Sequence, residues 1–536
     1  MHKSTFPLLY LDFLCIMMIF IVTSCKEDPR YEIPNLEDYN NLVWSDEFDE
    51  PGLDTSKWEL AGSHYWDHGE KQVYSGSPEN VFISEGFLVI KARETVDKLT
   101  GEKTYTSACV RSFGKNGLEY GRMDIRAKMP FGKGIISGFT MKPMDNITDT
   151  SMANAIEMAV VRGNATNMVL GNIRFIGLDN IPRYSGDWYQ MKEYNDFSRD
   201  YHTFSIVKEK GEIYYYVDGK FYYHVSKNEV IPADYPFDGM YNMNLNIAVG
   251  GIWAKSPDSL LTPFPQMLEV DYVRVYKNAD QKKKIECKDI AFPDLQEYQN
   301  LVWSDEFTKE KINVAYWTHE TGDYWFNNEI QSYTSDSTNA FIKHGCLVIS
   351  AIEKPDHVQS NRKYTSARLI TKGKVAFKYG RIDFKIKVDN GAGIWPAAWL
   401  LPDKDKFGVW PSSGEIDVME IFGTDSLTQH VTAHFGSNRN NHRSRGNKIH
   451  VPGGFANEFH MYTLVKEEDH MWWYFDGKPC YHLSRKLCLP HHYPFNEDFH
   501  VVLNVAIGGS TAGYPDEHVV FPRNMWVDHV RIYSKE

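Results

Sequence analysis

Three carboxylates in one short stretch are the residues of this sequence best placed to do acid–base chemistry. Residues 414–423 hold Glu415, Asp417 and Glu420 within a run of β-branched and apolar residues, which is typical of a β-strand. In a regular strand Glu420 would point away from the other two carboxylates. A β-bulge near Val418 would bring all three to one face, and bulges often re-aim side chains beside active sites.

Two Glu side chains on one face, with an Asp between them, suit the hydrolysis of a glycosidic bond. A retaining mechanism needs two carboxyl groups about 5–5.5 Å apart, one as nucleophile and the other as an acid that later becomes a base. The intervening Asp417 can hydrogen-bond to the nucleophile and help keep it ionised. The alternative is a solvated acidic strand, but apolar residues fill the gaps here and the surrounding sequence is rich in Trp.

The stretch Glu415–Glu420 resembles the bulged signature of family 16 glycoside hydrolases of the laminarinase type. The resemblance covers nearly all of residues 292–534 and keeps the order of the family's blocks. These blocks are Trp303–Phe307, Asn327–Tyr333, Tyr364–Arg368, Gly393–Trp399 and Val527–Tyr533, together with His434 and Asn504. The resemblance implies that Glu415 is the nucleophile, Asp417 its electrostatic partner and Glu420 the acid/base. Glu420 then needs a pKa raised by nearby negative charge and low solvation.

The resemblance also implies substrate contacts around these carboxylates. Trp395 and Trp399 lie four residues apart on one strand, so both can face the cleft and stack on sugar rings. His434 is expected on the next strand, near Glu420. Further candidate contacts are Glu329, Gln331, Tyr333, Arg368 and Asn504. Packing in the core is the alternative for the two Trp and for His434, and ordinary surface or core roles are the alternative for the rest.

A structural calcium ion away from the cleft is common in this family. The resemblance places its ligands at Asp528 and at the backbone carbonyl of Gly345, with Glu306 as a further ligand. Oxygen-only ligands suit Ca²⁺, whereas an ordinary surface Asp is the alternative at position 528. No cofactor is expected for the reaction itself.

An internal repeat organises the chain of 536 residues. The segment Pro34–Phe48 returns as Pro293–Phe307, and Tyr105–Ala108 returns at the same offset as Tyr364–Ala367. The offset between the copies is nearly constant along the chain and is long enough to hold a whole domain, so the repeat indicates two whole domains. We therefore divide the chain into a signal peptide (1–24), a first domain (33–277), a Lys-rich linker (278–291) and a second domain (292–536).

Both copies are expected to be all-β. Tyr214–Lys220 and Trp472–Lys478 each contain an aromatic strand followed by Asp-Gly, a strong hairpin signal. Long amphipathic helical patterns are absent after the N-terminal segment, so the pattern predicts two β-sandwiches. The resemblance sharpens this prediction to two tandem jelly rolls, each with a concave sheet that bears a cleft.

The first domain has lost most of the catalytic residues. Aligning residues 414–423 with residues 154–163 places Ala155 at the nucleophile, Glu157 at the Asp and Val160 at the acid/base. The residues at the positions of the two cleft Trp and the His are Ile136, Thr140 and Arg174. We expect a non-catalytic copy that binds glycan, holds the second domain away from a membrane, or packs against it.

The N-terminus is typical of a lipoprotein signal peptide. Lys3 precedes an apolar run from Leu8 to Val22, and Val22–Cys25 resembles a bacterial lipoprotein cleavage box in which Cys25 receives the lipid. The following Lys26–Asp28 resembles the surface-export tag of Bacteroidetes lipoproteins. An uncleaved anchor is the alternative, although the run is shorter than the ~20 residues of a spanning helix. We expect a lipid-anchored protein on the outer-membrane surface of a Bacteroidetes-like bacterium.

The composition of the chain indicates which classes of partner it can bind. A net charge of −13 argues against nucleic acid, and an aromatic content of 14 % suits a carbohydrate-binding surface. The Cys residues show no CxxC spacing, so a zinc site or a disulfide framework is not expected. Cys480 and Cys488 are interpreted as buried free thiols, with a disulfide between them as the alternative.

Together these observations predict a retaining endo-β-glycanase that cuts a polysaccharide, with laminarin-type β-1,3-glucan as the first choice of substrate. Mixed-linkage glucan, galactan and O-glycans are the alternatives within the enzyme class, because loops around a cleft set substrate choice. A glycan-binding surface lipoprotein without turnover is the alternative of another class. The three intact carboxylates of the second domain weigh against it.

Overall fold

The computed structural model describes residues 32–62, 69–112, 116–144, 154–177, 180–192, 195–230, 234–258, 260–279, 290–323, 325–353 and 362–535. The signal peptide, the lipidation site at Cys25 and most of the 278–291 linker lie outside these residues, so those predictions stay predictions. Within the described ranges, no helix has both the length and the apolar character needed to cross a bilayer.

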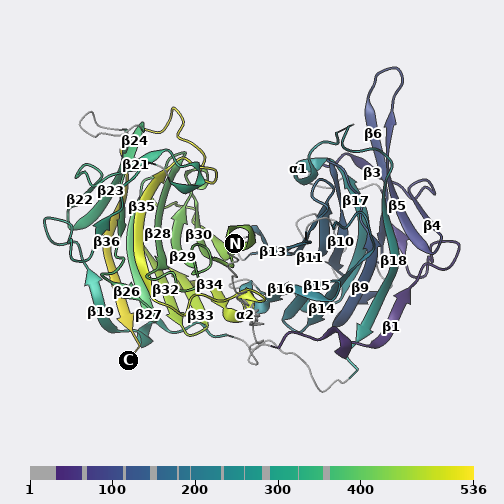
Figure 1. The fold of residues 1–536 in the computed structure, drawn as a ribbon, viewed down its shortest axis with the longest axis horizontal. Coiled ribbons are helices and arrows are strands. Elements are labelled where there is room, and N and C mark those ends of the chain that lie inside the picture. Colours follow the sequence, from purple (N-terminus) through teal and green to yellow (C-terminus); the bar gives the residue numbers. More distant parts are fainter. Residues whose placement is uncertain are drawn as a thin grey trace, which may run out of the picture. The chain divides into compact units, whose positions relative to one another are not determined.

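The first domain is a sandwich of two sheets with strongly curved strands (Figure 1). The ten-stranded outer sheet has the order β16 (Lys220–Ser226), β15 (Glu212–Val217), β14 (His202–Glu209), β9 (Gly121–Lys128), β18 (Gln266–Lys277), β5 (Phe87–Val96), β6 (Lys103–Ser107), β3 (Gln72–Tyr74), with β1 (Asn41–Asp46) on β18 and β4 (Val81–Ser84) on β5. The eight-stranded inner sheet has the order β13 (Pro182–Gln190), β12 (Met168–Ile176), β11 (Ala155–Arg162), β10 (Ile135–Pro143), β17 (Tyr241–Val249), β7 (Cys109–Arg111), β2 (Glu59–Leu60), with β8 (Gly117–Leu118) on β17.

The second domain repeats this strand order. Its ten-stranded outer sheet runs β21 (Gln331–Tyr333), β24 (Tyr364–Ser366), β23 (Cys346–Glu353), β36 (Arg523–Ser534), β27 (Gly380–Val388), β32 (His460–Glu467), β33 (His470–Phe475), β34 (Lys478–Ser484), with β19 (Asn300–Asp305) on β36 and β22 (Ala340–Lys343) on β23. Its eight-stranded inner sheet runs β20 (Thr318–His319), β25 (Arg368–Ile370), β35 (Phe499–Ile507), β28 (Ile394–Pro402), β29 (Glu415–Ile421), β30 (Thr428–Gly436), β31 (His442–His450), with β26 (Ala376–Phe377) on β35. The predicted all-β class and tandem sandwiches are therefore confirmed.

Helical structure within the described residues is limited to short segments. They are α1 (Gly251–Ala254), α2 (Arg485–Cys488) and the 3-10 turns η1 (Leu36–Asp38), η2 (Lys227–Glu229), η3 (Pro236–Asp238), η4 (Leu295–Glu297), η5 (Phe326–Asn328), η6 (Gly423–Asp425) and η7 (Arg439–Asn441). The two Asp-Gly hairpins form as predicted, with Asp476 at φ 47° and Gly477 at φ 73° between β33 and β34. Positive φ at both central residues matches the twist of the flanking strands.

The repeated Trp-Ser-Asp-Glu-Phe motif has the same structural role in each domain. In the second domain, the Asp305 carboxylate accepts hydrogen bonds from the Trp317 indole N–H at 3.0 Å and from the backbone N–H of Phe307 at 3.0 Å. Trp317 is 2 % exposed in the core between the sheets. Because a buried indole N–H needs an acceptor, the Asp allows the largest side chain to be buried. Asp46 and Trp58 repeat this pair in the first domain at 2.8 Å.

Free thiols lie in the core, as expected. Cys109, Cys346, Cys480 and Cys488 are all buried, and Cys480 and Cys488 form no disulfide. The alternative of a disulfide between Cys480 and Cys488 is therefore wrong. Burial raises the pKa of the Cys480 thiol, so this group behaves as a small apolar side chain.

Gly423 fixes the start of β28 against the end of β29. A Cβ at this position would lie 1.8 Å from the backbone carbonyl oxygen of Gly391. We expect Gly423→Ala to lower the free energy of unfolding by about 1–3 kcal/mol. The added Cβ would clash with backbone atoms, which cannot move aside as the end of a flexible side chain can. Thermal or urea unfolding of the purified protein measures this. Gly453→Ala is the matched control, since no atom lies within 4 Å of its added Cβ, and equal loss in both variants would contradict the steric explanation.

Candidate active site

The bulge predicted in the carboxylate strand is present in β29. Across from β28, Ala398 pairs with Met419 and Trp399 pairs with Asp417, so Val418 has no partner. The pairing with β30 shifts in the same interval, between Asp417 and Glu420. Val418 and Met419 are buried in the core, while Glu420 now faces the same side as Asp417. A single looped-out residue has converted an alternating strand into one that presents three carboxylates to one surface.

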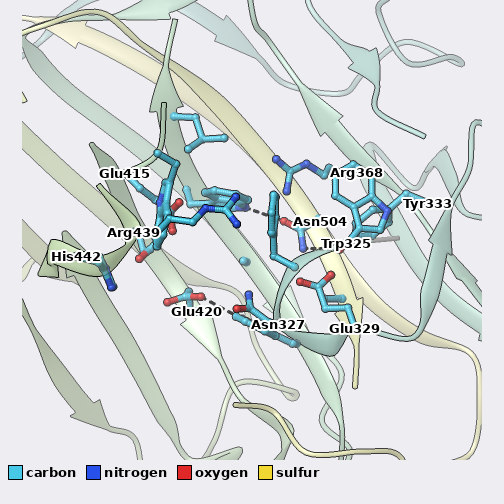
Figure 2. A pocket seen from close by; sticks show the side chains of 18 residues that line it. Trp325, Asn327, Glu329, Tyr333, Arg368, Glu415, Glu420, Arg439, His442 and Asn504 are labelled. Carbon is cyan, nitrogen blue, oxygen red and sulfur yellow. Dashed lines mark hydrogen bonds between the residues drawn. The ribbon is translucent and has the colours of Figure 1, made fainter. Parts of the chain in front are cut away.

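That surface is the floor of a cleft of about 410 Å³ on the concave sheet (Figure 2). Glu415 and Glu420 lie on one side of the view, and Arg368, Glu329 and Trp325 face them from the other. The residues from the sequence prediction that line the cleft are Glu415, Asp417, Glu420, Trp395, Trp399, Glu329, Tyr333, Arg368 and Asn504. The structure thus brings together side chains from strands that are far apart in the sequence.

His434 lies beside Glu415 and Asp417, at one end of the carboxylate row. It sits across the strand pair from Glu415, with its Nε2 at 3.0 Å from Asp417 Oδ2 and 3.9 Å from Glu415 Oε1. The position directly opposite Glu420 is occupied by His430. His434 follows His430 by four positions on β30, and its charge acts to lower the pKa of Glu420. The register therefore does not contradict the prediction that His434 lies near Glu420, although its nearest carboxylate is Asp417.

The environment separates the three carboxyl groups by their readiness to ionise. Burial, and then the charge of Asp417, raises the pKa of Glu415 to about 7, while His434 acts in the opposite direction. Burial, followed by the charge of Asp417, raises the pKa of Glu420 well above its ordinary value. Burial also raises the pKa of Asp417. Glu415 therefore ionises more readily than Glu420, and pairs of carboxyl groups pushed apart in this way are typical of acid and nucleophile roles.

Two indoles hold polar groups of the cleft in place. The Trp395 N–H donates to Glu420 Oε1 at 3.1 Å, and the Trp399 N–H donates to the side-chain oxygen of Asn504 at 2.7 Å. The Arg368 guanidinium lies 4.7 Å from the centre of the Trp399 ring and pairs with Glu320. Both Trp therefore combine an apolar face in the cleft with a fixed polar tip, as the sequence predicted for cleft residues.

Gln331 is not a cleft residue. It is fully buried, its amide N–H donates to Glu329 at 2.7 Å, and its carbonyl accepts from the Ile507 N–H at 2.8 Å. The prediction of a substrate contact at this position is wrong, because strand β21 turns the side chain inward. Gln331 instead orients Glu329, and burial raises the pKa of the Glu329 carboxyl. Nearby, the Tyr333 hydroxyl accepts a hydrogen bond from the Asn504 amide at 3.0 Å.

Several cleft residues were missed by sequence reasoning. They are Trp325, Phe326, Asn327, Trp410, Arg439 and His442. The Nδ1 of His434 lies 2.8 Å from Nε2 of His442, with the rings stacked, so His442 extends the row that starts at Asp417. All except His442, which begins β31, lie outside the described strands and in turns or loops. The Trp-Phe-Asn sequence just before Glu329 was the available signal.

The two carboxylates predicted to bind calcium both have nitrogen partners in the structure. Both carboxylate oxygens of Glu306 accept from Arg531, at 2.9 and 2.8 Å. Asp528 Oδ2 lies 2.8 Å from His529 Nδ1 and 3.3 Å from Lys385 Nζ. Cationic partners satisfy both carboxylates, so this donor set as placed does not fit Ca²⁺. The calcium ion stays a prediction, and no role is derived through it.

Comparison with known proteins identifies relatives of both domains. The chain is 30 % identical over 432 residues to Glucan endo-1,3-beta-glucosidase A1 of Niallia circulans, covering 75 % of this chain and 60 % of that protein. It is 36 % identical over 247 residues to Beta-glucanase of Rhodothermus marinus, covering 44 % of this chain and 84 % of that protein. The chain thus spans less than two thirds of the first relative's length.

A solved structure, the laminarinase catalytic domain from Thermotoga maritima, is 38 % identical, covers 45 % of this chain and 99 % of its own, and has a TM-score of 0.42. The family model for Glycosyl hydrolases family 16 matches the sequence twice, over residues 69–274 and 311–520. These two matches fall on the two sandwiches and cover most of the chain. The protein therefore belongs to glycosyl hydrolases family 16, of which it carries two tandem copies.

Proposed function

We propose that the second domain hydrolyses internal bonds of β-1,3-glucan with retention of configuration. The observation that carries the proposal is the bulged strand that places Glu415, Asp417 and Glu420 in one cleft. The names of the Niallia circulans and Rhodothermus marinus relatives, both glucan hydrolases, support the choice of substrate. Trp325, Trp399 and Trp410 in the cleft supply apolar faces suited to sugar rings.

In the first step, the ionised Glu415 attacks the anomeric carbon while the protonated Glu420 gives its proton to the departing glycosidic oxygen. This forms a glycosyl ester on Glu415 and releases the reducing-end side of the chain. In the second step, Glu420 takes a proton from water, and the resulting hydroxyl displaces Glu415 from the sugar. Esterification removes the negative charge of Glu415, which lowers the pKa of Glu420 and makes it a better base.

Asp417 and His434 shift the pKa values of Glu415 and Glu420 in opposite directions. The charge of Asp417 raises the pKa of both Glu, whereas His434 favours their ionised forms. Because Asp417 lies within 3.0 Å of the His434 ring, protons can be shared along this row without entering bulk water. We assign Trp395 the role of aiming the Glu420 carboxyl at the glycosidic oxygen, through its hydrogen bond to Oε1.

We also propose that Cys25 is lipidated and anchors the protein to the outer-membrane surface. The sequence at Val22–Cys25 and the following Lys-Glu-Asp support this proposal. Mass spectrometry of the purified membrane form would detect diacylglycerol on Cys25, and a Cys25→Ala variant should be released into the soluble fraction. A Cys25→Ala variant that stayed in the membrane would contradict the anchor.

We expect Glu415→Gln and Glu420→Gln each to lower turnover of laminarin by at least about 100-fold, since each variant loses one proton-transfer or nucleophilic role. Reducing-end release measures turnover. The folded state should survive at pH 8, because burial raises both carboxyl pKa values and neutral Gln avoids the desolvation of an ionised Glu. Azide should restore turnover to Glu415→Gly but not to Glu420→Gln on the natural substrate, and unchanged turnover in either Gln variant would contradict the assignment.

The stereochemistry of the product gives an independent measurement. Proton NMR of the first-formed reducing ends should show the β-anomer, because attack by Glu415 and then by water inverts the same carbon twice. The α-anomer appears later by spontaneous mutarotation. An initial α-anomer would mean direct attack by water and would rule out Glu415 as the nucleophile.

The pH dependence of kcat/KM should depend on the charge of Asp417. Activity requires ionised Glu415, so kcat/KM should fall as pH decreases through the Glu415 pKa of about 7, and fall at high pH as Glu420 loses its proton. Asp417→Asn removes a negative charge that raises the Glu415 pKa, so the acidic limb should move to lower pH. A pH–rate profile measures this, with Glu310→Gln, which removes an exposed carboxylate outside the cleft, as control. An acidic limb that stayed in place would contradict the coupling.

A further inference from the structure

The concave sheet of the first domain bears a second cleft, of about 130 Å³. The strand beneath it, β11, has the same register shift as β29, between Glu157 and Val160. Val160 pairs with Gly138 across β10, at the position where Glu420 pairs with Ala397. Ala155 pairs with Arg174. The bulge has been kept although the two residues that would do chemistry there are apolar.

The polar wall of this cleft repeats that of the second domain. Asn246 donates to the Tyr74 hydroxyl at 2.8 Å, and Gln72 donates to the Glu70 carboxylate at 3.2 Å. Asn246 and Glu70 both line the cleft. The same hydrogen bonds hold Asn504 and Glu329 in the second domain, at 3.0 and 2.7 Å. The wall that would contact sugar hydroxyls is therefore built in both copies.

The floor carries two side chains of each charge. Arg174 is only 7 % exposed and lines the cleft together with Glu157, Lys142 and Glu70. The Glu157 carboxylate is oriented by the amide of Asn172 at 2.9 Å. Two cations and two carboxylates give no net charge, so the cleft favours a neutral ligand whose groups both donate and accept. Sugar hydroxyls have this property.

Aromatic surface has moved from the floor to the rim. The positions of Trp395 and Trp399 are taken by Ile136 and Thr140. Two other aromatic residues line the cleft instead: Trp253, in α1, is 45 % exposed, and Tyr184, in β13, is 52 % exposed. Figure 1 shows α1 at the end of the inner sheet, next to β17 and β10. Large exposed aromatic side chains around a cleft that has a few polar groups in an apolar lining are typical of a binding site.

We propose that this cleft binds a neutral β-glucan chain without cleaving it. Trp253 and Tyr184 stack on sugar faces, while Arg174 and Glu157 hydrogen-bond to hydroxyls. The chain stays intact, because Ala155 and Val160 have no group that can attack carbon or move a proton. The choice of glucan rests on the function proposed for the second domain. The smaller volume of the cleft implies a shorter contact than in the catalytic cleft.

Isothermal titration of laminarin oligosaccharides into the Glu415→Gln, Glu420→Gln double variant of the full chain tests the proposal. We expect two sites per chain. Adding Trp253→Ala should weaken the second site by about tenfold, because it removes the larger of the two exposed aromatic faces that contact the sugar, and leave the first unchanged. Leu99→Ala, at a 97 % exposed position between β5 and β6, is the matched control and should leave both sites unchanged.

The outcomes distinguish the two proposals. A single site that Trp253→Ala does not alter would overturn the binding cleft and leave the hydrolase standing. If the native protein hydrolyses glucan but the titration shows no second binding site, the binding cleft is likewise overturned and the hydrolase stands. Absence of glucan binding by both clefts would overturn the choice of glucan and, with it, this inference. A dextran sulfate titration with equal or tighter binding to the second site would overturn the argument from charge balance.

Discussion

The structure of the catalytic domain depends on the cost of burying three carboxyl groups side by side. Ionised carboxylates lose much of their hydration when water is excluded, so their pKa values rise until some remain neutral. At Glu420 this cost keeps the proton that the reaction must donate. The strand can carry this cost because Val418, Met419 and Ile416 anchor it in an apolar core. The same bulge that turns Glu420 toward the cleft sends Val418 into that core.

Around this strand, hydrogen bonds from indoles and amides set the direction of each polar group. Trp395, Trp399 and Trp473 donate to Glu420, Asn504 and the Asp417 backbone carbonyl, respectively. Trp473 lies on the outer sheet, so its hydrogen bond joins the two layers directly beneath the central carboxylate. Because each of these three indole N–H groups finds an acceptor, rigid aromatic side chains can position the site at no cost of an unsatisfied donor of their own. Rigidity of this kind matters where a small misplacement of a reacting group is costly.

The fold and the catalytic strand could be predicted from the sequence because their signals are local or periodic. The bulge follows from the spacing of Glu415, Asp417 and Glu420, and the two domains follow from one constant offset. The cleft walls could not be predicted in the same way. Trp410, Arg439 and His442 reach the cleft from turns and strand ends whose course depends on tertiary packing. Gln331 was misplaced because strand β21 has only three residues, too few to fix which face is inward.

The two copies show which features serve the fold and which serve chemistry. Asp46 with Trp58 and Asp305 with Trp317 are retained, because a buried indole in either core needs its acceptor. The catalytic pair is not needed for the fold. Ala155 and Val160 remove two buried carboxyl groups and their desolvation cost, so the first domain gains stability where it gives up chemistry. Its bulge persists because β10 and β12 are registered on either side of it. Because β11 keeps its register without the catalytic carboxylates, the cleft above it can still serve as a ligand-binding surface.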